Sequence, residues 1–392
     1  MISEEDARRK ILEKVAPLPE RTVPLSGALG CFSSHDIVAR LLLPAFDNSA
    51  MDGYAVIANS CKKGQRLRVT GEQPAGRDKQ LRVSHGQAIR IFTGAPVPAG
   101  ADAVVMQEDV TRESDAEIVI NADVAPGDFI RRRGCDLTEG QRMLAKGERV
   151  RAATIALLAS QGLVDMAVGG EVTAAIVSTG DELVKPGKKI EPGQIYESNS
   201  VLLNALLQRC GAIVKCVQNC RDERELLIQA IRPGIENHVL IISGGVSVGE
   251  HDLVKDALHS LGAKIDVWRV AIKPGKPFLF GKIGKCAVFG LPGNPVSAFV
   301  TFLQFVRPAI LKMMGAIDLN PPWVPAKLTV DLTNDGDRVH YLRGKLEDGR
   351  FTPVGRQESH ALFGLSQSNA LLRVAVGESA RAGEIVEVQT WQ

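Results

Sequence analysis

The chain has 392 residues, more than one hydrophobic core usually supports, so we expect about two to four domains. Hydrophobic residues make up 45% and charged residues 23%, which is the composition of an ordinary water-soluble protein. The net charge of +2 excludes a broad nucleic-acid-binding face, which needs concentrated Lys and Arg. The basic run Arg131–Arg133 is too short to change this conclusion, although it could bind one or two phosphates.

The seven cysteines form no CxxC pair and have no histidine at zinc-ligand spacing, so we expect free or buried thiols in a reducing compartment. The charged N-terminal residues 1–15 do not resemble a signal peptide. No apolar run approaches the roughly 20 residues that a membrane helix needs. These features predict a cytoplasmic protein with neither a membrane nor a nucleic acid as its partner.

In chain order, the first predicted element is an amphipathic helix with Ser3 as its N-cap and Ile11, Leu12 and Val15 on one face. This helical N-terminal region opens a segment, residues 1–43, that we assign to the same domain as residues 138–171.

Between those two segments, residues 44–137 predict a β-rich inserted domain, because short alternating strands are separated there by Gly, Pro and Asp turns. A helix is predicted over 152–161, ended by Gly162.

From residue 172 to residue 318, strands alternate with helices. Strands are predicted at 174–177, 213–217, 239–242 and 287–289, and helices at 201–209, 223–231, 252–261 and 295–314. This alternation predicts a central three-layer α/β/α domain with a mostly parallel sheet. After the Asn320–Pro322 linker, short strands with glycine turns predict a small C-terminal β-barrel-like domain over 319–392.

Ligands of open parallel sheets bind outside the carboxyl ends of the strands, where the loops 178–182, 243–250 and 290–295 are expected. The second loop begins Ser243-Gly244-Gly245-Val246-Ser247 between an apolar strand and a helix. Glycines let backbone N–H groups approach a phosphate, and a helix N-terminus adds favourable potential. Many glycine turns only reverse the chain, but this position favours phosphate binding.

Seven segments of the chain occur in the order typical of one known family. They read DNSAMDGYAV, IFTGAPVPAGADAVVMQED, RRRGCDL, STGDEL, SGGVSVGEHD, AIKPGKPFLFG and LPGNPVSAF. Together they closely resemble the MoeA family, the molybdopterin molybdenumtransferases related to the gephyrin E domain. The resemblance extends from about residue 44 to residue 300, and the flanking segments have suitable lengths.

The resemblance implies a homodimer that binds adenylylated molybdopterin, cleaves its AMP and inserts molybdenum from molybdate, with Mg2+ assisting. The α/β domain would resemble the molybdopterin adenylyltransferase that makes the substrate, which is itself a possible partner. The site would lie between subunits, with the β-rich insert of one chain facing the α/β domain of the other. The motifs do not distinguish a preference for molybdenum from a preference for tungsten.

The resemblance also suggests roles for the acids of the loops. Asp252 is our first choice for Mg2+, together with Glu182, because a cation is needed between a carboxylate and phosphates. Each also has a plain structural explanation: Asp252 as an acid at a helix start, and Glu182 and Asp181 as a polar turn. Asp222 is expected to bind substrate, or else to cap the helix at Glu223.

The resemblance implies five catalytic residues. Glu182 and Asp252 belong to the loops of the α/β domain, and Asp52, Thr93 and Asp136 belong to the other subunit's side of the site. Without the family, Asp52 and Thr93 would be ordinary turn residues. Which of these acids serves as a base is left open.

Molybdate is an anion, so Lys273 and Lys276, on either side of a Pro-Gly turn, and the run Arg131–Arg133 are candidate cations. Solvated surface lysines are the alternative. Pro292 and Pro295 would form a rigid wall, or simply start the following helix. The complete predicted substrate-binding set is Asp222, Ser243, Gly244, Gly245, Ser247, Lys273, Lys276, Pro292, Asn294 and Pro295.

Two residues depart from the family's common pattern. Cys135 stands where an acid is frequent, which reduces the local negative charge, and Glu197 stands where an aspartate is common. The extra methylene of Glu197 is expected to shift a carboxylate that helps to position substrate.

Two other functions remain as alternatives: a non-catalytic scaffold or binding protein of the same fold, and the adenylyltransferase itself. Retention of the acids Asp52, Asp136, Glu182 and Asp252 favours the enzyme over the scaffold. An adenylyltransferase function would not explain the large domains that this chain has in addition to the α/β domain.

Overall fold

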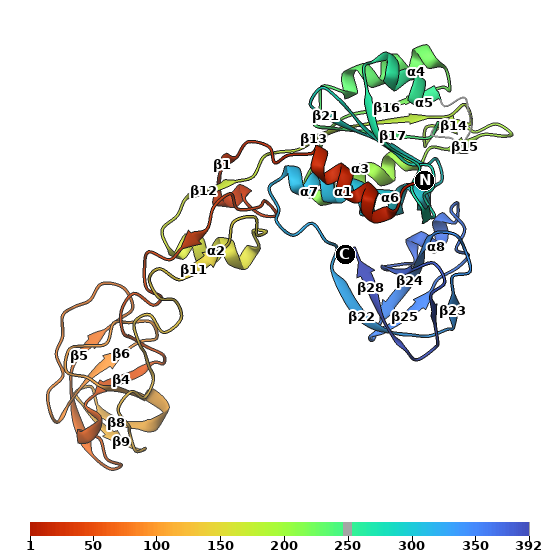
Figure 1. Cartoon of the computed structure of the whole chain (residues 1–392). Helices are drawn as coiled ribbons and strands as arrows, with labels where there is room; N and C mark the ends of the chain where they lie inside the picture. The colour runs from red at the N-terminus through yellow and green to blue at the C-terminus, as the bar shows by residue number, and fades with distance from the viewer. Residues whose placement is uncertain (246–252, 392) are drawn as a thin grey trace. The chain divides into compact units, whose positions relative to one another are not determined.

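The computed structural model describes residues 1–245 and 253–391 (Figure 1). The chain separates into two compact units. Unit 1 consists of Met1–His35, Lys146–Ile155 and Val164–Gln392, and unit 2 of Asp36–Ala145 and Ala156–Leu163. The four-domain division expected from the sequence stays a prediction.

The centre of unit 1 is a six-stranded sheet in the order β16-β13-β17-β21-β20-β18. Its strands are β13 (Thr173–Thr179), β16 (Ile213–Cys220), β17 (Val239–Ser243), β18 (Lys264–Trp268), β20 (Leu279–Ile283) and β21 (Cys286–Leu291). The first four strands in that order pair in parallel, whereas β20 pairs antiparallel with both of its neighbours. The mostly parallel sheet is confirmed, and β20 is an antiparallel strand that the sequence pattern did not reveal.

Side chains of each central strand alternate between two separate cores, as the two-residue period of a strand requires. In β13, Ala174 and Ile176 join one core, and Ala175 and Val177 join the other. The second core is covered by α4 (Arg224–Gly234) and α5 (Leu253–Ser260). The first is covered by α1 (Glu4–Lys14), α3 (Asn199–Cys210), α6 (Pro295–Thr301) and α7 (Arg307–Met313), on the opposite face of the sheet in Figure 1. The three-layer α/β/α prediction is therefore confirmed.

Capping residues mark the ends of two helices on the first face. Helix α1 (Glu4–Lys14) is capped by the Ser3 side chain, which accepts from the Asp6 backbone N–H at 3.0 Å. Helix α3 (Asn199–Cys210) ends at Gly211, whose φ of 89° is the left-handed conformation that glycine adopts at little cost.

The longest helix of the first face joins α6 (Pro295–Thr301), a π-helical turn (Phe302–Val306) and α7 (Arg307–Met313). Among the described residues it is the one helix long and apolar enough to cross a membrane, and 89% of its most apolar window is buried within the protein. Its apolar character is therefore explained by its place in the core of unit 1.

The C-terminal part of unit 1 is a closed barrel. Five strands pair in the cyclic order β24-β25-β22-β28-β26 and back to β24, and β19 adds to β24 from outside. They are β19 (Ile272–Lys273), β22 (Trp323–Leu328), β24 (Val339–Glu347), β25 (Arg350–Pro353), β26 (Ala370–Val374) and β28 (Ile385–Thr390). The short pair β23 (Leu332–Thr333) and β27 (Ser379–Ala380) and helix α8 (Leu362–Ser366) accompany the barrel. The barrel-like prediction is confirmed.

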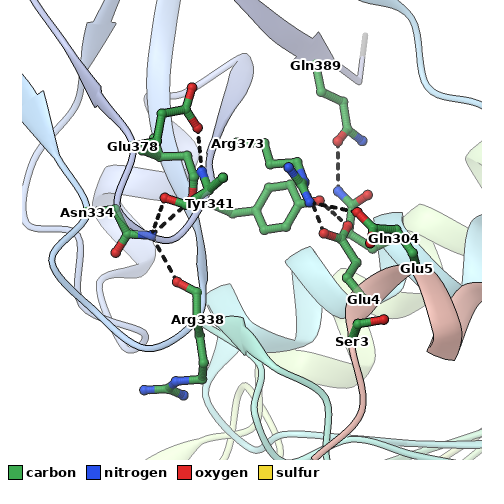
Figure 2. A network of polar contacts seen from close by, with 12 residues as sticks. Ser3, Glu4, Glu5, Gln304, Asn334, Arg338, Tyr341, Arg373, Glu378 and Gln389 are labelled. Carbon is green, nitrogen blue, oxygen red and sulfur yellow. Dashed lines mark hydrogen bonds and ion pairs between the residues drawn. The ribbon is translucent and has the colours of Figure 1, made fainter.

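Polar contacts join the barrel to the first helix (Figure 2). Arg373 of β26 donates to Glu4 and Glu5 of α1, each at 3.1 Å, and the Tyr341 hydroxyl donates to Glu4. Burial, followed by the charge of Glu4, raises the pKa of Tyr341, which therefore stays protonated as the donor.

The remaining elements of unit 1 are short. They are η1 (Leu25–Gly27), the pair β1 (Arg21–Pro24) and β12 (Asp165–Val168), and the pair β14 (Leu183–Val184) and β15 (Ile195–Tyr196). Helix α2 (Ala152–Ser160) contributes residues to both units.

Unit 2 is built on a six-stranded sheet in the order β7-β4-β6-β5-β9-β8. Its strands are β4 (Gly53–Val56), β5 (Arg66–Gln73), β6 (Gln87–Ile91), β7 (Ala103–Met106), β8 (Val110–Ser114) and β9 (Glu117–Ile120), with the short elements β2 (Ile37–Val38), β3 (Asn48–Ser49), β10 (Ile130–Arg131), β11 (Arg142–Leu144), η2 (Ala58–Ser60) and η3 (Gln107–Asp109). Val56, Leu67 and Ile118 belong to a core of its own. The β-rich character expected of this region is confirmed.

Candidate functional site

A pocket of about 640 Å³ lies in unit 1 at the carboxyl ends of the parallel strands β13, β17 and β21. Its walls come from the three loops that the sequence singled out, from the segment before α3, and from the barrel. The lining residues are Ser178, Thr179, Gly180, Glu182, Leu183, Ile195, Tyr196, Glu197, Ser198, Asn199, Asp222, Ser243, Gly244, Gly245, Pro277, Pro292, Gly293, Asn294, Pro295, His360 and Leu362. We call it the loop pocket.

The floor of the loop pocket is glycine for a steric reason. Gly244 has a φ of +90°, and a Cβ at that position would lie 2.3 Å from the backbone oxygen of Thr179. Gly245 has a φ of +64° and would bring a Cβ to 2.8 Å from Val254. A side chain fits at neither position, so the backbone itself forms this surface, as a phosphate cradle requires.

Asn199, at the start of α3, bridges two of the loops. Its Nδ2 donates to Ser243 Oγ at 2.9 Å and to the Gly293 carbonyl at 2.6 Å. Its Oδ1 and the hydroxyl of Ser178 are buried and have no hydrogen-bond partner among the described residues. Unpaired polar atoms in a pocket wall are costly without a ligand, so they point to a polar occupant.

Asp222 is held by β13 and does not cap a helix. Its Oδ1 accepts from the Thr179 hydroxyl at 2.6 Å, and its backbone N–H donates to Asp181 at 3.2 Å. The residue at the N-cap position of α4 is Glu223, which makes no capping bond with its side chain. The capping alternative for Asp222 is therefore wrong, because Thr179 holds its carboxylate. Glu182 is exposed on the wall of the same pocket.

Glu197 is buried and organises the start of α3. Its Oε1 accepts from the backbone N–H of Ser200 at 2.8 Å, and its Oε2 accepts from the Ser200 hydroxyl. The effect expected from its extra methylene stays a prediction, but both of its oxygens have partners within the chain.

Asn294 and Pro295 line the wall nearest the barrel. Asn294 Nδ2 donates to Ser359 Oγ at 2.8 Å, and Pro295 occupies the first turn of α6. His360 and Leu362 complete this wall. The sequence contained no local signal for these two residues, because they follow α6 by about 60 residues and arrive through the packing of the barrel.

Lys273 and Lys276 are not among the residues that line the loop pocket, although Pro277 is. Lys273 lies in β19 opposite His340 of the barrel. Burial first, and then the charge of Lys273, lowers the pKa of His340 to about 4, so His340 is neutral near pH 7. The structure thus places Lys273 beside the barrel.

Two predicted residues, Ser247 and Asp252, lie outside the described residues. Among those described, no group of three or more His, Cys, Asp or Glu could hold a metal ion. Mg2+, however, usually binds through one or two carboxylates and completes its shell with waters and substrate phosphates. Glu182 and Asp222, beside the Gly244–Gly245 backbone, fit that pattern.

In unit 2 the structure brings two of the three predicted residues together. Both the backbone N–H and the hydroxyl of Thr93 donate to Asp52 Oδ1 at 2.7 Å. These bonds, the backbone one first, hold the pKa of Asp52 below its usual value. Asp136 is exposed, and its backbone N–H donates to the Leu43 carbonyl at 3.0 Å. No contact between its side chain and Asp52 or Thr93 is observed among the described residues.

The basic run supports the loop before Asp136. Arg132 Nη1 lies 2.8 Å from an Asp47 oxygen, and the backbone N–H of Arg133 donates to the other oxygen at 2.7 Å. The Asp47 carboxylate therefore partly neutralises the charge of Arg132. Cys135, two residues after Arg133, is an exposed free thiol.

Family models match most of the chain. Residues 2–162 match the MoeA N-terminal region (domain I and II), residues 175–312 a probable molybdopterin binding domain, and residues 325–391 the MoeA C-terminal region (domain IV). The three matches occur in chain order and include both units.

Whole-length relatives agree with these matches. The molybdopterin molybdenumtransferase of Haemophilus influenzae is 37% identical over 99% of this chain and 98% of its own, and molybdopterin molybdenumtransferase 2 of Mycobacterium tuberculosis is 37% identical over 95% of each. A crystal structure of the molybdopterin biosynthesis MoeA protein from Pyrococcus horikoshii is 30% identical, with a TM-score of 0.84 over the whole of both chains. The chain therefore belongs to the MoeA family of molybdopterin molybdenumtransferases.

Proposed function

We propose that the protein inserts molybdenum from molybdate into adenylylated molybdopterin and releases AMP, the final step of molybdenum cofactor biosynthesis. The observation that carries the proposal is the loop pocket: a side-chain-free glycine floor beside the carboxylates of Glu182 and Asp222, at the carboxyl ends of parallel strands. Cleavage of the substrate breaks the phosphoanhydride bond by attack of water and leaves AMP as the second product.

The phosphate groups of the substrate would lie against the backbone of Gly244 and Gly245. Ser243 and Asn294 would bind its polar groups, and Asn199 would hold both loops in register through its bonds to Ser243 and Gly293. Pro292 and Pro295 would give the opposite wall its rigidity. This arrangement orients the reacting groups, which is how much of the barrier to a bimolecular step is removed.

Asp252 and Glu182 stay the proposed Mg2+ ligands, together with substrate phosphates, and Asp222 would add a carboxylate on the same pocket wall as Glu182. Ser247 stays a proposed substrate-binding residue. When bound, the ion would supply charge neutralisation on the phosphate oxygens. The chain's own contribution is to keep the Asp222 carboxylate in place through the Thr179 hydroxyl.

The second half of the site would come from unit 2 of a partner subunit in a homodimer. The hydrogen bonds from Thr93 keep Asp52 ionised, so its carboxylate can accept a hydrogen bond from a water molecule. We place Asp136 in the same role. Lys273, Lys276 and Arg131–Arg133 are the proposed cations for molybdate, and the enzyme that adenylylates molybdopterin is a proposed partner.

A cytoplasmic location follows from this proposal, because the Haemophilus influenzae and Mycobacterium tuberculosis relatives are bacterial biosynthetic enzymes and the apolar helix of unit 1 is buried. Free thiols agree with a reducing compartment, since all seven cysteines are unpaired.

The test is conversion of adenylylated molybdopterin by the purified protein in the presence of molybdate and Mg2+, measured as AMP release and as cofactor formation. Glu182→Gln and Asp222→Asn are expected to lower turnover about 100-fold or more, since each removes a charge from the pocket wall. Glu191→Gln, an exposed acid that does not line the pocket, is the control and should retain activity.

The same assay separates the alternatives. A scaffold protein would bind substrate without releasing AMP or forming cofactor. An adenylyltransferase would consume ATP with free molybdopterin, and the full-length match to molybdenumtransferases disfavours it. Absence of both products with the unmodified protein would contradict the proposal.

A further inference from the structure

A second pocket in unit 1 has a different chemistry. It has a volume of about 460 Å³ and lies between α3, the helix made of α6 and α7, and the end of barrel strand β28. It shares no lining residue with the loop pocket. We call it the arginine pocket after Arg149, Arg209 and Arg307, which line it together with Gln389, Phe302 and Trp391.

The charged side chains that line the arginine pocket are all positive. It is lined by three guanidinium groups, and none of its described lining residues is an aspartate or glutamate. Burial lowers the pKa of Arg307, and the neighbouring Arg149 lowers it further, against the opposing effects of Cys210 and Asp318. Arg149 also donates to the Gly30 carbonyl at 3.3 Å and lies over the Phe32 ring, so its direction is set by other groups.

Two buried donors of this pocket have no acceptor. Arg307 Nη1 and Gln389 Nε2 are both inaccessible to solvent and lack a hydrogen-bond partner among the described residues. Gln389 is fully buried, and its Oε1 accepts from Gln304 Nε2 at 2.7 Å, as Figure 2 shows. The bond orients the amide and leaves its N–H2 group without an acceptor. Native proteins rarely leave buried donors unpaired unless a ligand or water completes them.

Most of the other lining residues are apolar, with Thr390 as a polar exception. Phe302 and Leu303 contribute from the long helix, and Trp391 contributes an indole ring that is itself held edge-on against Phe299 at 5.0 Å between centroids. Pockets of roughly 300–1,000 Å³ with mainly apolar walls and a few placed polar groups are typical small-molecule sites. Guanidinium groups match the planar oxygens of carboxylates and phosphates.

We propose that the arginine pocket binds a small organic oxyanion, a carboxylate or phosphate carried on a compact aromatic or aliphatic body. The oxygens of its head pair with the guanidinium groups of Arg149, Arg209 and Arg307, and they reach the buried donors Arg307 Nη1 and Gln389 Nε2 once a small side-chain shift opens these atoms to the pocket. Its apolar body packs against Trp391 and Phe302. This site is separate from the proposed reaction and does not depend on it.

The test is calorimetric titration of the full-length protein with four probes: benzoate, phenyl phosphate, inorganic phosphate and neutral benzamide. The proposal expects saturable binding of benzoate or phenyl phosphate, and at least about tenfold weaker binding of benzamide, which lacks the charge. The better of the two anions identifies the head group. Inorganic phosphate, which has no apolar body, should bind more weakly than phenyl phosphate.

Variants place the binding in this pocket. Arg307→Met and Gln389→Leu each remove one unpaired donor and should weaken the preferred anion about tenfold or more. Arg209 is exposed, so Arg209→Met should leave folding intact and weaken binding by a smaller factor. Arg232→Met, on the far face of the sheet and outside both pockets, is the matched control and should bind like the unmodified protein.

Three results would overturn the proposal. One is equal binding of benzamide and benzoate, and another is unchanged anion affinity in both Arg209→Met and Gln389→Leu. The third is no binding of any probe by the unmodified protein while Arg307→Met weakens self-association in sedimentation, since a second copy of the chain would then fill the pocket.

Discussion

A single residue, Thr93, lowers the pKa of the Asp52 carboxyl group through two hydrogen bonds. Two donors from one residue, a backbone N–H and a hydroxyl, converge on the same carboxylate oxygen at 2.7 Å. Arg90 adds a weaker favourable charge. Because both donors favour the ionised form, the pKa of Asp52 falls below its usual value, and the carboxylate stays charged at lower pH than an aspartate without these bonds.

Thr93→Val should raise the pKa of Asp52 only part of the way, since it removes the hydroxyl but keeps the stronger backbone bond. With a depressed pKa, Asp52 contributes stability above its ordinary pKa and loses it as the pH falls through the lowered value. The variant should therefore move this loss, and any acid limb of the activity profile, to higher pH. Carboxyl NMR titration measures it, with Thr70→Val as control. An unchanged Asp52 pKa would show that the hydroxyl does not matter.

At the scale of elements, the turn after β17 decides the shape of the loop pocket. Its first glycine is needed for two reasons that can be separated: a left-handed backbone, and a close approach to β13. Gly187 offers a comparison, because its φ of +87° is nearly that of Gly244, at +90°, but a Cβ there would meet nothing within 4 Å.

Gly187→Ala should cost only the strain of a left-handed alanine, about 1–2 kcal/mol of the free energy of unfolding. Gly244→Ala adds a Cβ at 2.3 Å from the Thr179 oxygen, so the turn must move. We expect a larger loss of stability and a strong loss of AMP release. Urea unfolding and the AMP assay measure both. Equal effects of the two substitutions would mean that the close approach to β13 is unimportant.

The whole molecule consists of two units with separate cores, which predicts that they respond separately to core damage. The cores on both faces of the central sheet consist of unit 1 residues. Ile118 of unit 2 is fully buried in a separate core made of unit 2 residues. Since burial in one core does not stabilise the other directly, the two units are expected to unfold in distinguishable steps.

Ile118→Ala should destabilise unit 2 by about 2–5 kcal/mol through loss of buried methylenes and the cavity left behind. Amide hydrogen exchange of β13 and β17 in unit 1 should be unchanged. Ile241→Ala, in the central sheet, is the reciprocal variant and should leave exchange in β6 and β9 unchanged. Equal acceleration in both units from either substitution would indicate one cooperative unit.

The sequence alone determined the elements and the family. The alternation of apolar strands with helices predicted the three-layer domain, since strand and helix periods are local properties of the chain. Ser3 and Gly211 marked helix ends through capping chemistry that depends on a few neighbouring residues. The glycine loops after β17 and β21 were predictable as pocket walls because parallel strands end at one edge.

Only the tertiary structure decided which distant residues meet. It brought His360 of the barrel into the loop pocket and placed Lys273 beside His340. It also brought the Asp222 carboxylate to the Thr179 hydroxyl, which donates a hydrogen bond to it. It also gathered Arg149, Arg209, Arg307 and Gln389 from four segments into one pocket. Such contacts depend on how elements pack, and packing is set by side chains that are far apart in the sequence, so no local pattern announces them.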